Sequence, residues 1–154
     1  MLKINSKLGG LNWEVPYCKH DQELLQVFGM DVSHPNASNE KIEKSMAAVT
    51  ASTSANLMKY SAIIREQNKS MKNQKSVNEI IEKLDDIVEN LIRQCAKENN
   101  KLPDRLIFYR DGVSEGQFKI VLVEELSMIQ RACKKIQPGY EPGITFITVR
   151  KRHQ

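Results

Sequence analysis

The chain has 154 residues, which is the length of one domain and enough to bury a hydrophobic core. Its net charge of +4 and sequence pI near 8.9 permit a nucleic-acid partner without requiring one. No apolar run approaches the ~18 residues of a membrane span, and the N-terminus has no signal-peptide core. The three cysteines are widely spaced and form no CxxC pair, so neither a zinc site nor a disulfide framework is indicated, and a reducing compartment is expected.

The first ten residues predict a short amphipathic helix that Gly9 and Gly10 end. Lys3 and Lys7 are four positions apart and would share one face of that helix. The segment is too short to be stable alone and is interpreted as the end of a longer helix. The residues by themselves favour solvated lysines near a helix C-terminus, where the helix dipole stabilises positive charge.

Three strands are predicted next, at residues 25–32, 45–52 and 60–65, and their short connections favour an antiparallel meander. The first strand is mostly apolar, which predicts burial on both of its faces. Asp31 interrupts this strand, and a carboxylate there must be paired, hydrogen-bonded or bound to a cation. A hydrogen bond to the following turn, residues 33–35, and a bound cation are equally open at this point.

From residue 77 to residue 95, apolar residues recur every three or four positions and predict a long amphipathic helix with Ser76 as its N-cap. A polar loop, residues 66–78, precedes this periodic stretch. Glu79 would lie in the first helical turn, where the residues alone suggest a carboxylate that complements the helix dipole. Cys95 lies on the apolar stripe and is predicted to be a core residue.

A fourth strand is predicted at residues 106–109. Ser114 and Gln117 have the spacing of a capping box and predict the start of a second helix, from about residue 115 to residue 136. A turn cluster then leads to a fifth strand, residues 144–149. The inward face of the second helix is predicted to carry Phe118, Val121, Leu122, Leu126, Ile129, Ala132 and Cys133.

The order of these elements predicts a mixed sheet, because strand–helix–strand connections form right-handed parallel crossovers. Asp31 lies near the end of the first strand and Asp111 directly after the fourth. If the two strands are neighbours, the carboxylates meet at the carboxyl edge of the sheet, where ligands of α/β domains gather. Such a pair can share divalent cations, and two Mg²⁺ ions ~4 Å apart would make the site a nuclease. A receiver-like, phosphate-handling domain is an alternative, but no glycine-rich phosphate loop supports it.

Four motifs, in the same order and across nearly the whole chain, resemble the PIWI domain of Argonaute proteins. They are Leu-Lys-Ile-Asn-Ser-Lys-Leu-Gly-Gly at residues 2–10, Gly-Met-Asp-Val-Ser-His-Pro at residues 29–35, Tyr-Arg-Asp-Gly-Val-Ser-Glu-Gly-Gln-Phe at residues 109–118, and Pro-Gly-Ile-Thr-Phe-Ile-Thr-Val-Arg-Lys-Arg-His at residues 142–153. The ten-residue motif is highly specific to the family.

The resemblance implies an α/β, RNase H-like fold with a mixed five-stranded sheet and flanking helices. It assigns residues 1–24 to the end of a MID domain and its border segment, and residues 25–154 to a partial PIWI domain. The N-terminal, PAZ and most MID segments would be missing, and the PIWI domain would be C-terminally incomplete. The chain is therefore expected to be a fragment, with apolar surface exposed on its fifth strand.

The family's catalytic residues are two aspartates, a glutamate and a final histidine or aspartate, and they cut the RNA target paired to a guide. The resemblance matches Asp31 and Asp111 to the aspartates, which would hold two Mg²⁺ ions, and Glu79 to the glutamate. The fourth residue would lie beyond Gln154. The full-length protein is thus expected to be a metal-dependent endoribonuclease and the fragment alone to be inactive.

The resemblance also implies the contacts to nucleic acid. Lys3 and Lys7 match the pair that holds the guide 5′-phosphate, and Lys151 and Arg152 match a basic segment along the guide backbone. The expected partners are a small guide RNA, a complementary target RNA and further proteins of a silencing complex, with no membrane. The expected compartment is the cytoplasm, with the nucleus as a second one. A non-cleaving module that binds guide RNA and recruits silencing partners is the alternative function.

Overall fold

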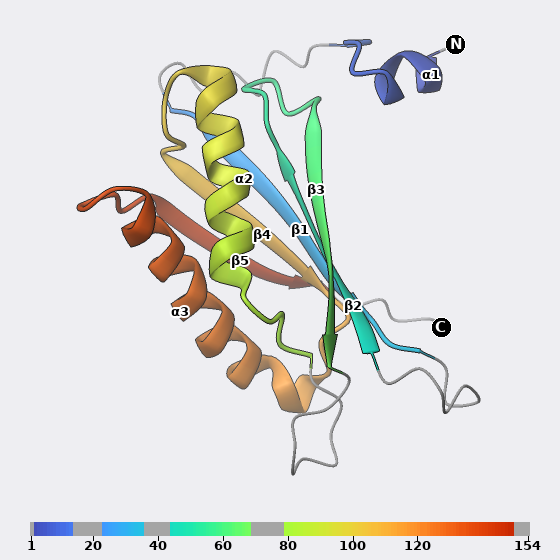
Figure 1. Ribbon diagram of the computed structural model, residues 1–154, viewed down its shortest axis with the longest axis vertical. Coiled ribbons are helices and arrows are strands. Elements are labelled where there is room, and N and C mark those ends of the chain that lie inside the picture. Colours follow the sequence, from blue (N-terminus) through green and yellow to red (C-terminus); the bar gives the residue numbers. More distant parts are fainter. Residues whose placement is uncertain (1, 14–22, 36–43, 69–78, 150–154) are drawn as a thin grey trace.

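The computed structural model describes residues 2–13, 23–35, 44–68 and 79–149, and Figure 1 shows their arrangement. The elements are α1 (Leu2–Lys7), β1 (Leu25–Ser33), β2 (Lys44–Ser52), β3 (Tyr60–Asn68), α2 (Leu84–Asn99), β4 (Arg105–Asp111), the 3₁₀ turn η2 (Glu115–Gln117), α3 (Phe118–Ile136) and β5 (Gly143–Val149). The predicted order of strands and helices is confirmed. The third strand is longer than predicted, since it continues to Asn68 into what was expected to be a loop.

The five strands form one mixed sheet in the order β3-β2-β1-β4-β5. β1 pairs antiparallel with β2, and β2 pairs antiparallel with β3. β1 also pairs with β4, and β4 with β5, in parallel. The predicted antiparallel meander and parallel crossovers are therefore both confirmed, and β1 is the strand at which they join.

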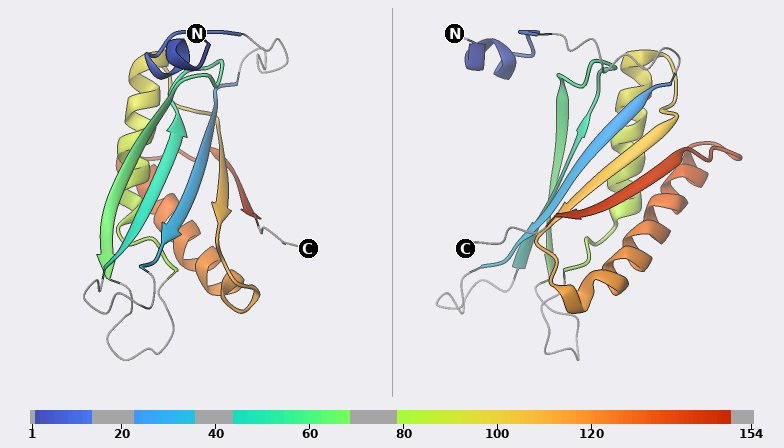
Figure 2. Two further views of the ribbon diagram at one scale, coloured as in Figure 1. Left: turned by 90° about the vertical axis from the view of Figure 1, so that its right-hand side faces the viewer. Right: turned by 180° about the vertical axis from the view of Figure 1, so that it is seen from behind.

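Both long helices cover the same face of the sheet (Figures 1 and 2). Every second residue of each inner strand points to that face, because side chains alternate along a strand. Phe28 and Phe108 stack there with ring centroids 4.4 Å apart, and Val49 is fully buried beside them. The core of the chain thus lies between the sheet and the α2–α3 layer.

No described helix covers the opposite face of the sheet, which is called the open face below (Figure 2). The prediction that β1 is buried on both sides is wrong, because Asp31 is exposed and only the alternate residues of β1 are buried. Ile147 and Val149 of β5 also lie more than a third exposed, in line with the apolar surface expected on the fifth strand.

α2 begins seven residues later than residue 77, where the apolar periodicity starts. Residue 77 and Ser76 lie outside the described residues, but Glu79 is described and is not helical, so its predicted place in the first turn is wrong. Lys83, the residue before α2, has a left-handed φ of 53°. Side chains from β3 and α3 bind the backbone at residues 80–82 and hold it out of the helix. Cys95 is buried in the core as predicted.

α3 follows the single turn η2, and the predicted capping box is not formed in the usual way. The Ser114 hydroxyl donates to the Gln117 side-chain oxygen at 3.3 Å, and Gln117, the N-cap residue of α3, makes no side-chain capping bond. Val121, Ile129, Ala132 and Cys133 are buried as predicted. Leu122 is 39% exposed instead of facing inward, since Glu125 completes the buried stripe with Val121, Met128, Ile129 and Ala132.

α1 is a six-residue helix, and the backbone turns away after it at Gly9, which has a φ of 82°. The predicted helix and its glycine stop are therefore confirmed. None of the residues of α1 is buried, and the helix lies beyond the end of the sheet at which β1 and β4 begin (Figures 1 and 2). Within the part of the chain that the structure describes, no helix has the length and apolar character needed to cross a bilayer.

Candidate metal and nucleic-acid site

Asp31 and Asp111 come together at the carboxyl ends of two neighbouring parallel strands. The last registered pair of β1 and β4 joins Met30 to Arg110, so the two aspartates occupy the next position along both strands. Both project to the open face, because their strand neighbours Met30 and Arg110 are buried under the helices. With Tyr109 and other strand residues they line a cavity of about 380 Å³. The expected juxtaposition of the two carboxylates is thus present.

The turn after β4 keeps the space between these carboxylates open. Gly112 has a φ of 82°, a conformation that side chains disfavour. Its N–H donates to Asp111 Oδ1 at 2.8 Å. A Cβ atom at Gly112 would lie only 3.2 Å from Asp31 Oδ1, so a glycine here leaves room beside that carboxylate. The cavity and its two carboxylates have the donor chemistry that Mg²⁺ takes, a few carboxylates completed by water and phosphate oxygens.

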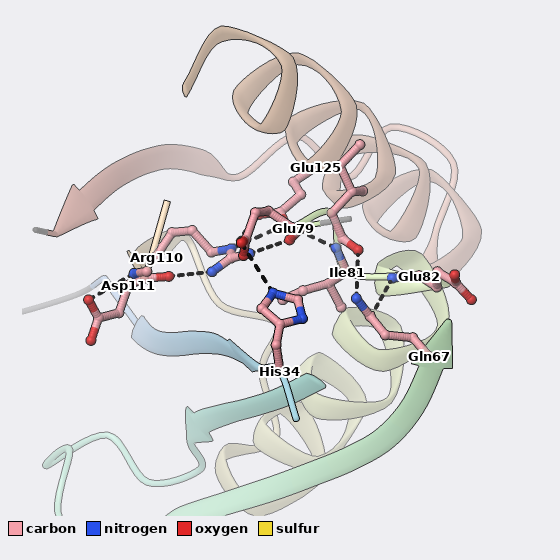
Figure 3. A network of polar contacts seen from close by, with 10 residues as sticks. His34, Gln67, Glu79, Ile81, Glu82, Arg110, Asp111 and Glu125 are labelled. Carbon is pink, nitrogen blue, oxygen red and sulfur yellow. Dashed lines mark hydrogen bonds and ion pairs between the residues drawn. The ribbon is translucent and has the colours of Figure 1, made fainter. Parts of the chain in front are cut away.

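Glu79 does not line this cavity. Its Oε1 lies 3.1 Å from Nε2 of His34 (Figure 3). Nδ1 of that histidine lies 2.7 Å from the hydroxyl of the buried Ser45. Both side chains of the His34–Glu79 pair are mostly buried. Among the described residues, no three acidic, histidine or cysteine side chains converge as a metal-binding group. The structure therefore brings Asp31 and Asp111 together but leaves Glu79 beside His34.

A buried ion pair lies directly behind the aspartates. Arg110 and Glu125 are both fully buried, and Arg110 Nε lies 3.2 and 3.3 Å from the two carboxylate oxygens. Burial raises the pKa of Glu125, and the Arg110 guanidinium and the Ile81 N–H oppose that rise. The other guanidinium nitrogens donate to the backbone oxygens of Asp111 and Glu79 (Figure 3). Arg110 thus ties the end of β4 to the segment that carries Glu79.

Three residues of this network were missed by the sequence interpretation. Arg110 alternates with the buried Leu106 and Phe108, and this alternation could have placed it under the helices. Glu125 falls four positions after Val121 on the buried stripe of α3, so helical spacing contained that signal. His34 falls in the turn at residues 33–35 that follows the first predicted strand. Nothing local indicated its bond to Glu79, 45 residues away.

The basic residues that were matched to guide contacts either lie apart from the aspartates or fall outside the described residues. Lys3 and Lys7 are exposed residues of α1. This helix lies beyond the end of the sheet at which β4 begins (Figure 2), whereas Asp111 is the last residue of β4. The spacing of four between Lys3 and Lys7 puts both ammonium groups on one side of α1. Lys151 and Arg152 lie outside the described residues.

The fold is the RNase H-like α/β fold, with an aspartate at the end of each of two adjacent central strands. The Piwi domain profile matches residues 1–154, and the chain belongs to the Piwi domain family. A relative, protein argonaute 7 of Oryza sativa subsp. japonica, is 39% identical over 160 residues. That match covers 99% of this chain and 14% of the relative, so the chain spans about one seventh of the relative's length.

Solved structures of similar chains agree with this placement. Kluyveromyces polysporus Argonaute with a guide RNA has a TM-score of 0.80 and 27% identity, covering 99% of this chain and 17% of that one. The MID-PIWI domains of N. crassa QDE-2 have a TM-score of 0.73 and 28% identity, covering 96% of this chain and 41% of that one. Drosophila Piwi has a TM-score of 0.67 and 25% identity, and the match covers 96% of this chain and 18% of that one.

Proposed function

We propose that this chain forms the catalytic part of a protein that binds a small guide RNA and cleaves the RNA paired to it. The main support is the aspartate pair at the carboxyl ends of β1 and β4, in a chain of the Piwi domain family. The Kluyveromyces polysporus Argonaute that the chain resembles was solved with a guide RNA. The net charge of +4 suits a polyanionic partner.

Asp31 and Asp111 would hold the metal ions of this reaction. Their position at one sheet edge and the room left by Gly112 fit Mg²⁺, which needs few protein carboxylates. Bound Mg²⁺ supplies positive charge to the attacking and leaving oxygens of a phosphodiester. Glu79 would orient water at the site. Tyr109 lines the same cavity.

The full-length protein tests this proposal in a cleavage assay with a guide and a matched RNA. Asp31→Asn and Asp111→Asn keep the side-chain shape but remove the negative charge that holds the metal. Each should reduce cleavage by more than about a hundredfold, because loss of even outer partners of a metal site costs 10- to 100-fold. Guide binding should be unchanged. Cleavage by either variant at the unsubstituted rate would refute the metal-binding role.

Lys3 and Lys7 would contact the 5′-phosphate of the guide, since two exposed ammonium groups on one helical face can converge on one phosphate. Replacing both by glutamate should remove the preference for a 5′-phosphorylated guide over a 5′-hydroxyl guide. Lys97→Glu, an exposed charge reversal on α2, is the control. Equal losses for both guides would show a general charge effect instead. Lys151 and Arg152 would follow the guide backbone.

The second candidate is a module that binds guide RNA and recruits silencing proteins without cutting. The bond between Glu79 and His34 favours it, because the Glu79 carboxylate is engaged by His34 and Glu79 is not among the residues that line the cavity of the aspartate pair. The same assay separates the two candidates. Tight binding of a guide and its target with no Mg²⁺-dependent product would support the non-cleaving module.

A further inference from the structure

The segment that carries Glu79 is held by side chains from other elements instead of by its own helix. Gln67, near the end of β3, donates from Nε2 to the Ile80 oxygen at 3.0 Å and accepts from the Glu82 N–H at 3.2 Å. Glu125 of α3 accepts from the Ile81 N–H at 3.1 Å. Figure 3 shows these bonds converging on consecutive backbone groups.

These contacts select one of two conformations open to the segment. Ile80 and Ile81 continue the helical spacing of α2 upstream, so the sequence is compatible with another turn of helix. In an added turn that begins at residue 80, the Ile80 oxygen would accept from the Leu84 N–H, and the Ile81 and Glu82 N–H groups, as first-turn donors, would have no partner within the helix. Here the backbone is not helical, and Gln67 and Glu125 bind these same three groups. An added turn would also rotate Glu79 around the helix axis. Gln67 and Glu125 therefore hold the backbone next to Glu79 in its non-helical path, and together with His34 and Arg110 they contribute to the direction in which Glu79 points.

We propose that Gln67 and Glu125 are positioning residues that set the place of Glu79 through the backbone of residues 80–82. The inference rests on the proposed cleavage function, because it concerns how Glu79 is presented to the aspartate pair. Both side chains are almost completely buried, at 4% and 0% exposure. Buried polar groups of this kind hold their partners firmly, because an unmade bond there is costly. A simple core role would be served equally well by an apolar side chain.

Gln67→Met tests the proposal, because methionine keeps the length of the side chain but makes neither backbone bond. Gln26→Met is the matched control. Gln26 is also fully buried on the sheet, and its Nε2 donates to the Ser52 and Leu91 oxygens at 3.0 Å each. It lies near the start of β1, away from the aspartates. The two variants should therefore lose comparable folding stability.

In the full-length protein, only Gln67→Met should change the site. Single-turnover cleavage at saturating guide and target should fall about ten- to a hundredfold, as expected for a displaced catalytic group, while target affinity is retained. Hydrogen exchange at the amides of Ile81 and Glu82 should accelerate at the same time. Gln26→Met should leave the cleavage rate and the exchange of these two amides near their original values.

Glu125→Gln is a second variant, since it keeps an oxygen that can accept from the Ile81 N–H. It should retain more cleavage than Glu125→Leu, which has no acceptor. Equal cleavage by the Gln67→Met and Gln26→Met variants, with wild-type cleavage present, would overturn the positioning role and leave the proposed function intact. A wild-type protein that shows no cleavage dependent on Asp31 and Asp111 would instead overturn the proposed function.

Discussion

The backbone conformation of Gly112 and its missing side chain both affect the aspartate pair. Its φ of 82° belongs to the left-handed region, and the missing Cβ leaves space beside Asp31 Oδ1. Gly139 has the same φ, but a Cβ there would meet nothing within 4 Å. Substitutions at Gly112 and Gly139 therefore share the cost of backbone strain, and only the substitution at Gly112 also crowds the Asp31 carboxylate.

We expect Gly112→Ala and Gly139→Ala to destabilise the protein by a similar amount, about 1–2 kcal/mol, because both place a side chain in left-handed backbone. Thermal unfolding measures this shared cost. Only Gly112→Ala should also raise the Mg²⁺ concentration needed for half-maximal cleavage, since its Cβ displaces Asp31. If both variants show the same Mg²⁺ dependence, the contact at Gly112 has no role in the site.

The Arg110–Glu125 pair gives a second prediction at this scale. Glu125→Leu leaves a guanidinium buried without its carboxylate, which should cost about 3–5 kcal/mol of unfolding free energy. The double variant Arg110→Met/Glu125→Leu removes both charges and should be less destabilised than the sum of the two single variants. Urea denaturation measures all three. Strict additivity would mean that the two charges do not stabilise each other.

Single residues also show how far sequence reasoning reaches. Asp31 and Asp111 could be placed because each stands at the end of a predicted strand, and strand ends are local features. The orientation of Glu79 could not be placed, because it depends on His34, Gln67, Arg110 and Glu125, which come from four separate parts of the chain.

At the scale of elements, the start of α2 is the main difference between expectation and structure. Helical periodicity continues upstream of Leu84, but long-range hydrogen bonds outweigh that local preference. The positions of the strands were predicted, apart from the end of the third, because turn signals separate them along the chain. The buried stripe of α3 was predicted only in part, since Glu125 and Met128 are buried without having been predicted and Leu122 is exposed. The exposed leucine and the buried glutamate reverse the usual pattern.

Ion pairs join α2 and α3 at the exposed edge of their contact. Lys135 lies 2.8 Å from Asp85 and 3.0 Å from Asp86. The hydrogen bond from Lys135 lowers the pKa of Asp85, and the hydrogen bond to Asp85 is the main cause of the raised pKa of Lys135. Both shifts favour the charged forms in the folded protein.

We predict that Lys135→Met destabilises the protein only within a limited pH range. The lowered pKa of Asp85 stabilises the folded protein at pH values above the ordinary aspartate pKa. This stabilisation is lost as the pH falls through the lowered pKa. The raised pKa of Lys135 stabilises the folded protein at pH values below the ordinary lysine pKa. This stabilisation is lost as the pH rises through the raised pKa. The difference from wild type should thus be full between about pH 4 and pH 10 and shrink outside it. Lys134→Met is the neighbouring control, and a pH-independent difference would contradict the ionic origin.

At the scale of the whole molecule, the sheet has one face packed under helices and one open face. The strand alternation predicts which residues share a face, but it does not show which face the helices cover. The right-handed crossover rule predicts the parallel pairing of the strands but not that one face stays without helices. The prediction that β1 is buried on both faces was therefore wrong. The aspartates lie on the open face, where a large polymer can reach them.

This asymmetry predicts different tolerance on the two faces. Val49→Thr buries a hydroxyl beneath α2 and should cost about 1–3 kcal/mol, since Val49 is fully buried. Ile64→Thr should stay within about 0.5 kcal/mol, because Ile64 is 64% exposed. Denaturant midpoints of the two variants make the comparison. A larger loss at Ile64 would show that another part of the protein covers the open face.

The join at β1 has a consequence for the order in which the chain assembles. β1, β2 and β3 are consecutive and can pair as soon as residues 25–68 have been synthesised. β4 pairs with β1 only after α2 has also been made, and such distant pairing is slow because a long loop must first close. We therefore expect the β1–β3 sheet, which carries Asp31, to form before β4 brings Asp111 beside it. A chain that stops before β4 contains only one of the two carboxylates.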